Sequence, residues 1–137
     1  MKKLLFLSVA ALCCMSHSCV EEREGHHFIT VKNNGNDTIV CVERWQGRIE
    51  PDDTLYPCHI GGLTILPNNQ REFEAGDEVW EEDFKIIPFI QFFIINDSIY
   101  KNIPCDTIRK YNMILHHYKL TLEDLQRMNW VVDYPPK

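Results

Sequence analysis

One apolar run constrains the fold of this 137-residue chain more than any other feature. It reads PFIQFFII, from Pro88 to Ile95, and is followed by the polar segment Asn96-Asp97-Ser98. Aromatic and β-branched residues dominate the run, and such residues favour strands over helices. A short run with so little polar alternation indicates a strand that is buried on both faces. We therefore expect it to be the central strand of the domain.

Shorter strand patterns lie on both sides of this run. Phe28–Lys32 and Thr38–Val42 are separated by a polar segment containing Asn34-Gly35, a pattern typical of a β-hairpin. Proline, glycine and asparagine punctuate residues 51–69, where we expect loops and short strands. Further strands are expected at 99–100, 114–120 and 130–134.

Helix signals are limited to short segments. Trp80 and Phe84 are four residues apart, which suits one helical turn. Thr121 can cap the backbone amide of Asp124 and so begin a second helix. The sequence therefore predicts a mainly β fold, at the edge of the α+β class. We expect an antiparallel β-sandwich or rolled sheet with one or two short helices near the C-terminus.

The first 18 residues have the organisation of a secretory signal peptide. Two lysines precede an apolar segment, which ends in Ser16-His17-Ser18 directly before Cys19. The apolar segment is too short to cross a hydrocarbon core of about 30 Å. We expect residues 1–18 to be cleaved, which leaves 119 residues beginning at Cys19.

The residues directly before Cys19 resemble the lipobox of bacterial lipoproteins. That resemblance implies that the thiol of Cys19 is diacylated, that the leader is removed and that the new N-terminus is acylated. Ser18 fits the family, whereas Ser16 stands where leucine is usual and His17 where a small residue is usual. Ordinary signal peptidase cleavage at the same bond is the alternative, because Ser16-x-Ser18 also satisfies a small-x-small rule.

An acidic segment, Val20-Glu21-Glu22-Arg23-Glu24, follows Cys19. It resembles the export signal of surface-exposed lipoproteins of the Bacteroidetes, which implies an outer-membrane location facing outward. A solvated tether over residues 19–26 is equally compatible with this composition, and both interpretations can hold together. A single β-rich globular domain is then expected over residues 27–137.

The C-terminal stretch reads Tyr118-x-Leu120-Thr121-x-x-Asp124-Leu125-x-x-Met128-Asn129-Trp130-x-Val132-x-Tyr134-Pro135. It resembles the signature of small Bacteroidales lipoproteins of unknown function. Trp80-Glu81-x-x-Phe84 and Phe28-x-x-Val31-x-Asn33 are similar to the middle and the start of that family. These are helix-capping and core residues, so the resemblance implies a shared fold and brings no catalytic assignment.

Charge argues against one class of partner. The chain has 20 acidic and 14 basic residues, a net charge of −6, and removal of Lys2 and Lys3 with the leader makes it −8. A polyanion would be repelled, so we do not expect nucleic acid as a partner. The sequence also carries no motif that calls for a cofactor.

Four cysteines follow the leader, namely Cys19, Cys41, Cys58 and Cys105. In an oxidising compartment the last three are candidates for a disulfide, and the sequence leaves the pairing open. If Cys19 is acylated, at most one intramolecular disulfide can form; otherwise four cysteines allow three full pairings. The absence of C-x-x-C argues against a redox motif or a zinc knuckle.

Catalytic patterns are weak. Ser98 lacks a G-x-S-x-G context, and the pairs His26-His27 and His116-His117 lack the i, i+4 spacing of a shared metal. The acidic cluster within residues 77–83 could gather calcium ligands, although a solvated helix face is the simpler interpretation. We therefore do not expect an enzyme. A carboxylate pair for glycoside hydrolysis stays open, because its separation depends on the fold.

Trp45 is the candidate ligand contact, since aromatic faces bind sugar rings and Gln46-Gly47-Arg48 predicts a loop beside it. Trp80 and Trp130, in periodic settings, are expected in the core. The sequence favours a non-enzymatic, lipid-anchored envelope protein, an interaction or structural module whose partners are the membrane and a glycan or protein ligand. A surface glycan-binding accessory protein is the alternative, and an enzyme with a carboxylate site comes third.

Overall fold

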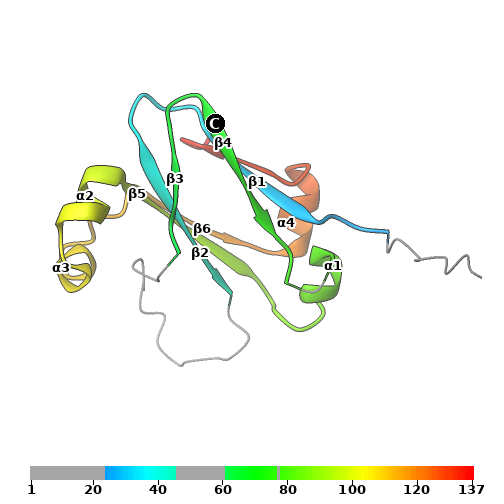
Figure 1. Cartoon of the computed structure of the whole chain (residues 1–137). Coiled ribbons are helices and arrows are strands. Elements are labelled where there is room, and N and C mark those ends of the chain that lie inside the picture. Colours follow the sequence, from blue (N-terminus) through cyan, green and yellow to red (C-terminus); the bar gives the residue numbers. More distant parts are fainter. Residues whose placement is uncertain (1–23, 46–60, 77) are drawn as a thin grey trace, which may run out of the picture.

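The computed structural model describes residues 24–45, 61–76 and 78–137. Within these ranges the chain forms a three-stranded sheet, a four-stranded sheet and four short helices (Figure 1). The two sheets pack against each other, so the prediction of a mainly β, sandwich-like fold is confirmed. These four helices are more than the one or two expected near the C-terminus, although a helical turn at Trp80 was also predicted.

The three-stranded sheet has β1 (Phe28–Asn33) at its centre. β4 (Asn69–Glu74) pairs with it in antiparallel fashion, and β7 (Val131–Tyr134) pairs in parallel. The parallel pair departs from the expected all-antiparallel arrangement. No hairpin joins β1 to β7, and strands that are far apart in the sequence can pair in either direction.

The four-stranded sheet is antiparallel throughout, in the order β3-β2-β5-β6. Its strands are β3 (Leu63–Ile65), β2 (Ile39–Trp45), β5 (Ile90–Asn96) and β6 (His116–Leu120). β5 is the apolar run that the sequence predicts as the central strand, and it lies between β2 and β6. That prediction is confirmed.

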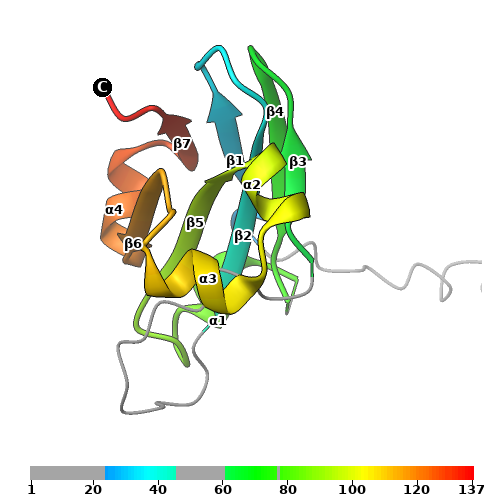
Figure 2. The same ribbon diagram turned by 90° about the vertical axis from the view of Figure 1, so that its left-hand side faces the viewer.

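Both faces of β5 are buried. Phe92 and Ile94 belong to the core between the two sheets, whereas Phe93 and Ile95 pack with Val40 on the opposite face of their sheet. Figure 2 shows helices α2 (Asp97–Asn102) and α3 (Cys105–Lys110) over that opposite face. Each fully buried apolar side chain contributes about 1.5–3 kcal/mol, so the run PFIQFFII stabilises two layers at once.

Helix α2 replaces the strand expected at residues 99–100, and that prediction was wrong. The Oδ1 atom of Asn96 accepts hydrogen bonds from the backbone N–H groups of Ser98 and Ile99, at 3.0 and 3.4 Å. Asn96 is thus a helix N-cap and not part of a turn between strands. The polar segment that ends β5 begins a helix.

The helix predicted after Leu120 is confirmed. In α4 (Leu122–Arg127), Thr121 accepts a hydrogen bond from the Asp124 amide at 3.3 Å, and the Asp124 carboxylate accepts one from the Thr121 amide at 3.0 Å. This reciprocal pair is a capping box. The turn expected near Trp80 is also helical, as α1 (Trp80–Asp83).

The hairpin expected between residues 28 and 42 does not form. β1 and β2 lie in different sheets, and the connection at residues 34–38 carries the chain from one sheet to the other. The connection between β3 and β4 makes the return crossing at the same end of the domain (Figure 1). The sequence pattern identified both strands correctly, but strand patterns alone do not show which strands pair.

Asn33 is fully buried where these crossings meet. Its Nδ2 atom donates to the carbonyl oxygen of Asp37 at 2.8 Å and to that of Ile65 at 3.1 Å. Its Oδ1 atom accepts from the backbone N–H of Gly35 at 3.0 Å. One amide therefore joins the end of β1, the following connection and β3.

We predict that Asn33→Ala lowers the free energy of unfolding by about 2–3 kcal/mol, because a carbonyl of β3 and two backbone groups of the connection lose their partner. Urea denaturation followed by tryptophan fluorescence measures the change. Asn36→Ala, at an exposed position of the same connection, is the control and should cost less than about 0.5 kcal/mol. Equal effects of the two substitutions would contradict the role assigned to Asn33.

Candidate functional site

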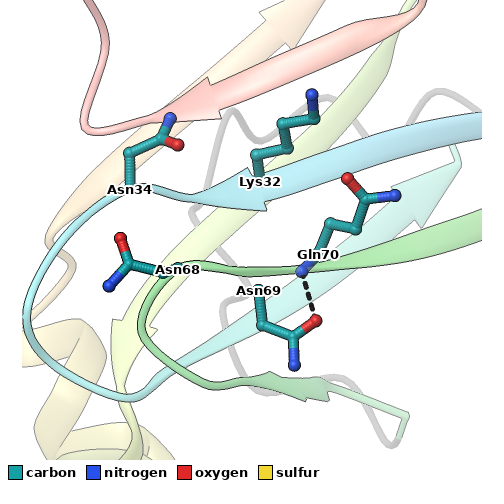
Figure 3. A pocket seen from close by; sticks show the side chains of 5 residues that line it. All are labelled: Lys32, Asn34, Asn68, Asn69 and Gln70. Carbon is teal, nitrogen blue, oxygen red and sulfur yellow. Dashed lines mark hydrogen bonds between the residues drawn. The ribbon is translucent and has the colours of Figure 1, made fainter.

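An open hollow of about 380 Å³ lies at the end of the three-stranded sheet where both crossings occur (Figure 3). Five polar side chains line it, and four of them are amides. They are Lys32, Asn34, Asn68, Asn69 and Gln70. We call this feature the amide hollow.

The register of β1 and β4 places two of these side chains next to each other. Lys32 and Gln70 are direct partners across the antiparallel pair. Because strand residues alternate between faces, and Val31 is buried in the core, Lys32 points to the outer face of its sheet. Figure 3 shows the Lys32 and Gln70 side chains rising from neighbouring strands on one side of the sheet.

The remaining lining residues come from the strand ends. Asn68 has a φ of 55°, a left-handed conformation that asparagine tolerates better than most residues. The backbone N–H of the next residue, Asn69, donates to the carbonyl oxygen of Leu66 at 3.1 Å. The side-chain oxygen of Asn69 accepts a hydrogen bond from the backbone N–H of Gln70 at 2.8 Å. The tight turn before β4 therefore sets the positions of the amides.

Asn34 is held from the β7 side. Its backbone N–H donates to the carbonyl of Tyr134 at 2.6 Å, and its side-chain amide donates to the carboxylate of Asp133 at 2.9 Å. Hydrogen bonds from Lys137 and Asn34 lower the pKa of Asp133, so this carboxylate stays ionised as an acceptor. The position of Asn34 is thus fixed by backbone and side-chain contacts together.

Tyr118 secures β7 to the other sheet. Its hydroxyl donates to the carbonyl oxygen of Asp133 at 2.6 Å. Burial, together with the nearby Tyr134, Asp133 and Cys41, raises the pKa of Tyr118 to about 12. The hydroxyl therefore keeps its proton and remains a donor at every physiological pH.

The amide hollow is suited to hydrogen bonding. Each amide offers an N–H₂ donor and a carbonyl acceptor, and Lys32 adds a cationic donor. The described residues that line it include no thiol, histidine or carboxylate. The hollow can hold a polar ligand, but its lining provides no nucleophile paired with a base.

A second polar cluster lies at the other end of β1. The imidazole of His26 stacks on Trp130, with ring centroids 4.2 Å apart, and its Nδ1 atom lies 2.7 Å from the Glu81 carboxylate. The His26 backbone N–H donates to the same carboxylate at 2.8 Å, and its carbonyl accepts from Trp80 at 2.8 Å. His26, the last residue of the expected tether, is therefore fixed against α1.

The acidic residues around α1 mostly serve local contacts. Buried Asp83 accepts a hydrogen bond from Gly76 at 2.9 Å, Glu82 pairs with Lys85 at 2.6 Å, and Glu81 binds His26. Asp77 lies outside the described residues. In the part of the chain that the structure describes, no three side chains of the metal-binding types gather at one point.

The cysteine candidates fall into two groups. Cys41 is free and buried. Its burial, and to a smaller extent the nearby charge of Glu43, raises the pKa of its thiol well above the usual range. Cys105 is disulfide-bonded. Cys19 and Cys58 lie outside the described residues, and so does the partner of Cys105, because Cys41 is the other cysteine described.

Two of the three tryptophan candidates have described side chains, and the third does not. Trp80 and Trp130 are buried in the core, which confirms their expected positions. Trp45, the predicted ligand contact, is the last residue of β2, and its side chain lies outside the described part of the structure. His117 stacks on Phe93 with centroids 4.4 Å apart and lies 2.7 Å from the Gln91 side-chain oxygen.

The sequence did not reveal the amide hollow. Its asparagines occur in Asn33-Asn34-Gly35-Asn36 and Pro67-Asn68-Asn69, which the sequence pattern indicates only as turns. The available signal was the polar composition of two turns. Only the pairing of β1 with β4 shows that these turns lie next to each other.

Comparison with known proteins adds no residue assignment to this geometry. No protein-family model, curated protein or solved structure matches the chain. The resemblance to small Bacteroidales lipoproteins therefore stays a prediction. Within the described residues, no helix has both the length and the apolar character needed to cross a membrane.

The contact between His26 and Glu81 generates a pH-dependent prediction. Partial burial alone would raise the pKa of Glu81, but hydrogen bonds from the His26 side chain and backbone outweigh it and lower the pKa. The stability from this carboxylate is therefore present above its unfolded pKa near 4.3 and is lost as pH falls through the lower folded value.

We predict that Glu81→Gln destabilises the domain at pH 5 and that its difference from wild type shrinks towards pH 3. Urea denaturation at the two pH values measures this difference. Glu72→Gln, at an exposed position on β4, is the control and should differ little from wild type at either pH. A constant difference for Glu81→Gln would exclude ionised Glu81 as its source.

Proposed function

We propose that this chain is a lipid-anchored protein of the cell envelope, held in the outer membrane through Cys19. Its β-sandwich domain would be a non-enzymatic interaction module that binds a glycan or protein ligand. The observation that carries the proposal is the amide hollow, an exposed polar site at the end of β1 remote from His26. The N-terminal leader and Cys19 support the membrane anchor.

The arrangement of β1 favours presentation of the hollow away from the membrane. The chain enters the domain at His26, beside α1, and β1 then runs to the end that carries the amide hollow (Figure 1). Six strand residues at about 3.3 Å each separate the two ends by about 20 Å. A domain anchored through residues 19–25 would thus direct its hollow outward.

The cysteines also favour this proposal. Cys41 is free and too buried for ready reaction, and Cys105 is disulfide-bonded. If Cys58 is the partner of Cys105, Cys19 remains for acylation, and every cysteine of the mature chain has a role. The odd number left after lipidation is then accounted for by one buried thiol.

We predict that native protein extracted from membranes carries acyl chains at Cys19, and that Cys19→Ser abolishes them and releases the protein into the soluble fraction. Intact mass spectrometry measures the acyl mass. Peptide mapping without reduction should recover Cys105 linked to Cys58, with Cys41 as the free thiol after denaturation. An unmodified chain of 119 residues, or a Cys19–Cys105 link, would contradict the anchor.

A surface glycan-binding accessory protein is the second candidate function. The amide hollow favours it, because amide groups can donate to one sugar hydroxyl and accept from its neighbour. Lys32 adds a cation that suits glycans with a carboxylate group. The hollow is open, so a weakly held terminal sugar fits it better than an enclosed ligand.

A glycan array with neutral and acidic glycans, followed by titration calorimetry of the hits, tests this second function. We predict that Gln70→Ala weakens glycan binding about tenfold, as loss of one ligand hydrogen bond implies. Gln126→Ala, an exposed glutamine on α4, is the matched control. Loss of binding in Trp45→Ala, but not in Gln70→Ala, would move the site to Trp45, and an array without hits would oppose glycan binding.

A further inference from the structure

The segment between α1 and β5 exposes apolar side chains. Ile86 is 73% exposed, the largest exposed fraction among the big hydrophobic residues that the structure describes. Three residues later, Phe89 lies under the ammonium group of Lys119, which is 4.1 Å from its ring centroid. We call residues 85–89 the anchor-side loop.

This loop directly follows α1, and α1 contacts the point where the N-terminal segment joins the domain. Glu81, which binds His26 twice, belongs to α1, and the backbone N–H of Ile86 donates to Asp83 of the same helix at 3.0 Å. Gly25 also approaches α1 so closely that a Cβ atom there would lie 2.8 Å from Glu81 Oε2. The chain therefore leaves the domain beside α1, the helix that leads directly into the anchor-side loop.

The length of chain before Gly25 limits how far this end can move from an anchor at Cys19. The six residue-to-residue steps from Cys19 to Gly25, each at most about 3.6 Å, span roughly 20 Å. A domain of about 110 residues is roughly 35 Å across, so the tether is shorter than the domain it holds. An acylated Cys19 would keep the α1 end of the domain within roughly 20 Å of the membrane surface.

We propose that the anchor-side loop contacts the bilayer that holds the lipid anchor, with Ile86 entering the headgroup region. This inference rests on the proposed acylation of Cys19. Transfer of an exposed isoleucine out of water is favourable, and the ammonium group of Lys119, which lies over Phe89 of the same loop, suits a lipid phosphate. The nearby carboxylates of Glu81 and Glu82 already pair with His26 and Lys85.

The test uses the acylated, full mature chain reconstituted into vesicles of phosphatidylethanolamine and phosphatidylglycerol. An environment-sensitive fluorophore is attached at Ile86→Cys, and lipids carrying a quencher report its depth. Leu66→Cys is the matched control, because Leu66 is 55% exposed but lies in the connection between β3 and β4, at the end with the amide hollow. Intact mass measured on the same samples reports acylation independently.

We predict at least a twofold rise in emission and strong lipid quenching at position 86, with neither at position 66. An acylated chain without these changes at position 86 would overturn the bilayer contact and leave the anchor intact. A chain without acyl groups would overturn both proposals. If the emission at position 86 is equally high without vesicles, the loop contacts protein and not lipid.

Ile86→Asp provides a second measurement. Its exposed position makes a folding defect unexpected, and thermal unfolding checks this. The acylated variant should still float with vesicles, because the anchor is unchanged. Quenching of a fluorophore at Phe89→Cys should fall at least twofold when Ile86→Asp is added, and unchanged quenching would contradict insertion of Ile86.

Discussion

The buried side chain of Asn33 is the contact on which the arrangement of the two sheets depends. The chain crosses between the sheets at residues 34–38 and again between β3 and β4, so backbone groups at both crossings lose their ladder partners. A single amide donates to two of these carbonyls and accepts from one N–H. Because unsatisfied groups are costly in a low-dielectric interior, loss of this amide would destabilise the crossing.

The two sheets differ in what their outer faces carry. β5 buries both of its faces, since helices α2 and α3 cover the outer side of the four-stranded sheet. β1 is also a central strand, but its outward residues include Thr30 and Lys32. Their partners on the neighbouring strand β4 are Glu72 and Gln70. The outer face of the four-stranded sheet is therefore covered by helices, whereas the outer face of β1 and β4 is polar and at least partly exposed.

Much of the fold could be predicted from local signals. The apolar run at 88–95 identified β5, and Thr121 with Asp124 identified the start of α4, because each depends on residues close together in the chain. The pairing of β1 with β4 and β7 could not be predicted, since it depends on long-range packing. The amide hollow was missed for the same reason, because its amides come from two turns joined only by that pairing.

The position of β1 has a mechanical consequence. Under the proposed function, a ligand in the amide hollow would pull on the end of β1 and the start of β4, and a lipid at Cys19 would pull on the other end of β1. β1 is hydrogen-bonded on both sides, to β4 and to β7, and these bonds run across the direction of pull. Tension would load many bonds in shear together, and not one at a time as in the unzipping of a hairpin. A pull along β1 would therefore be resisted by both neighbouring strands together.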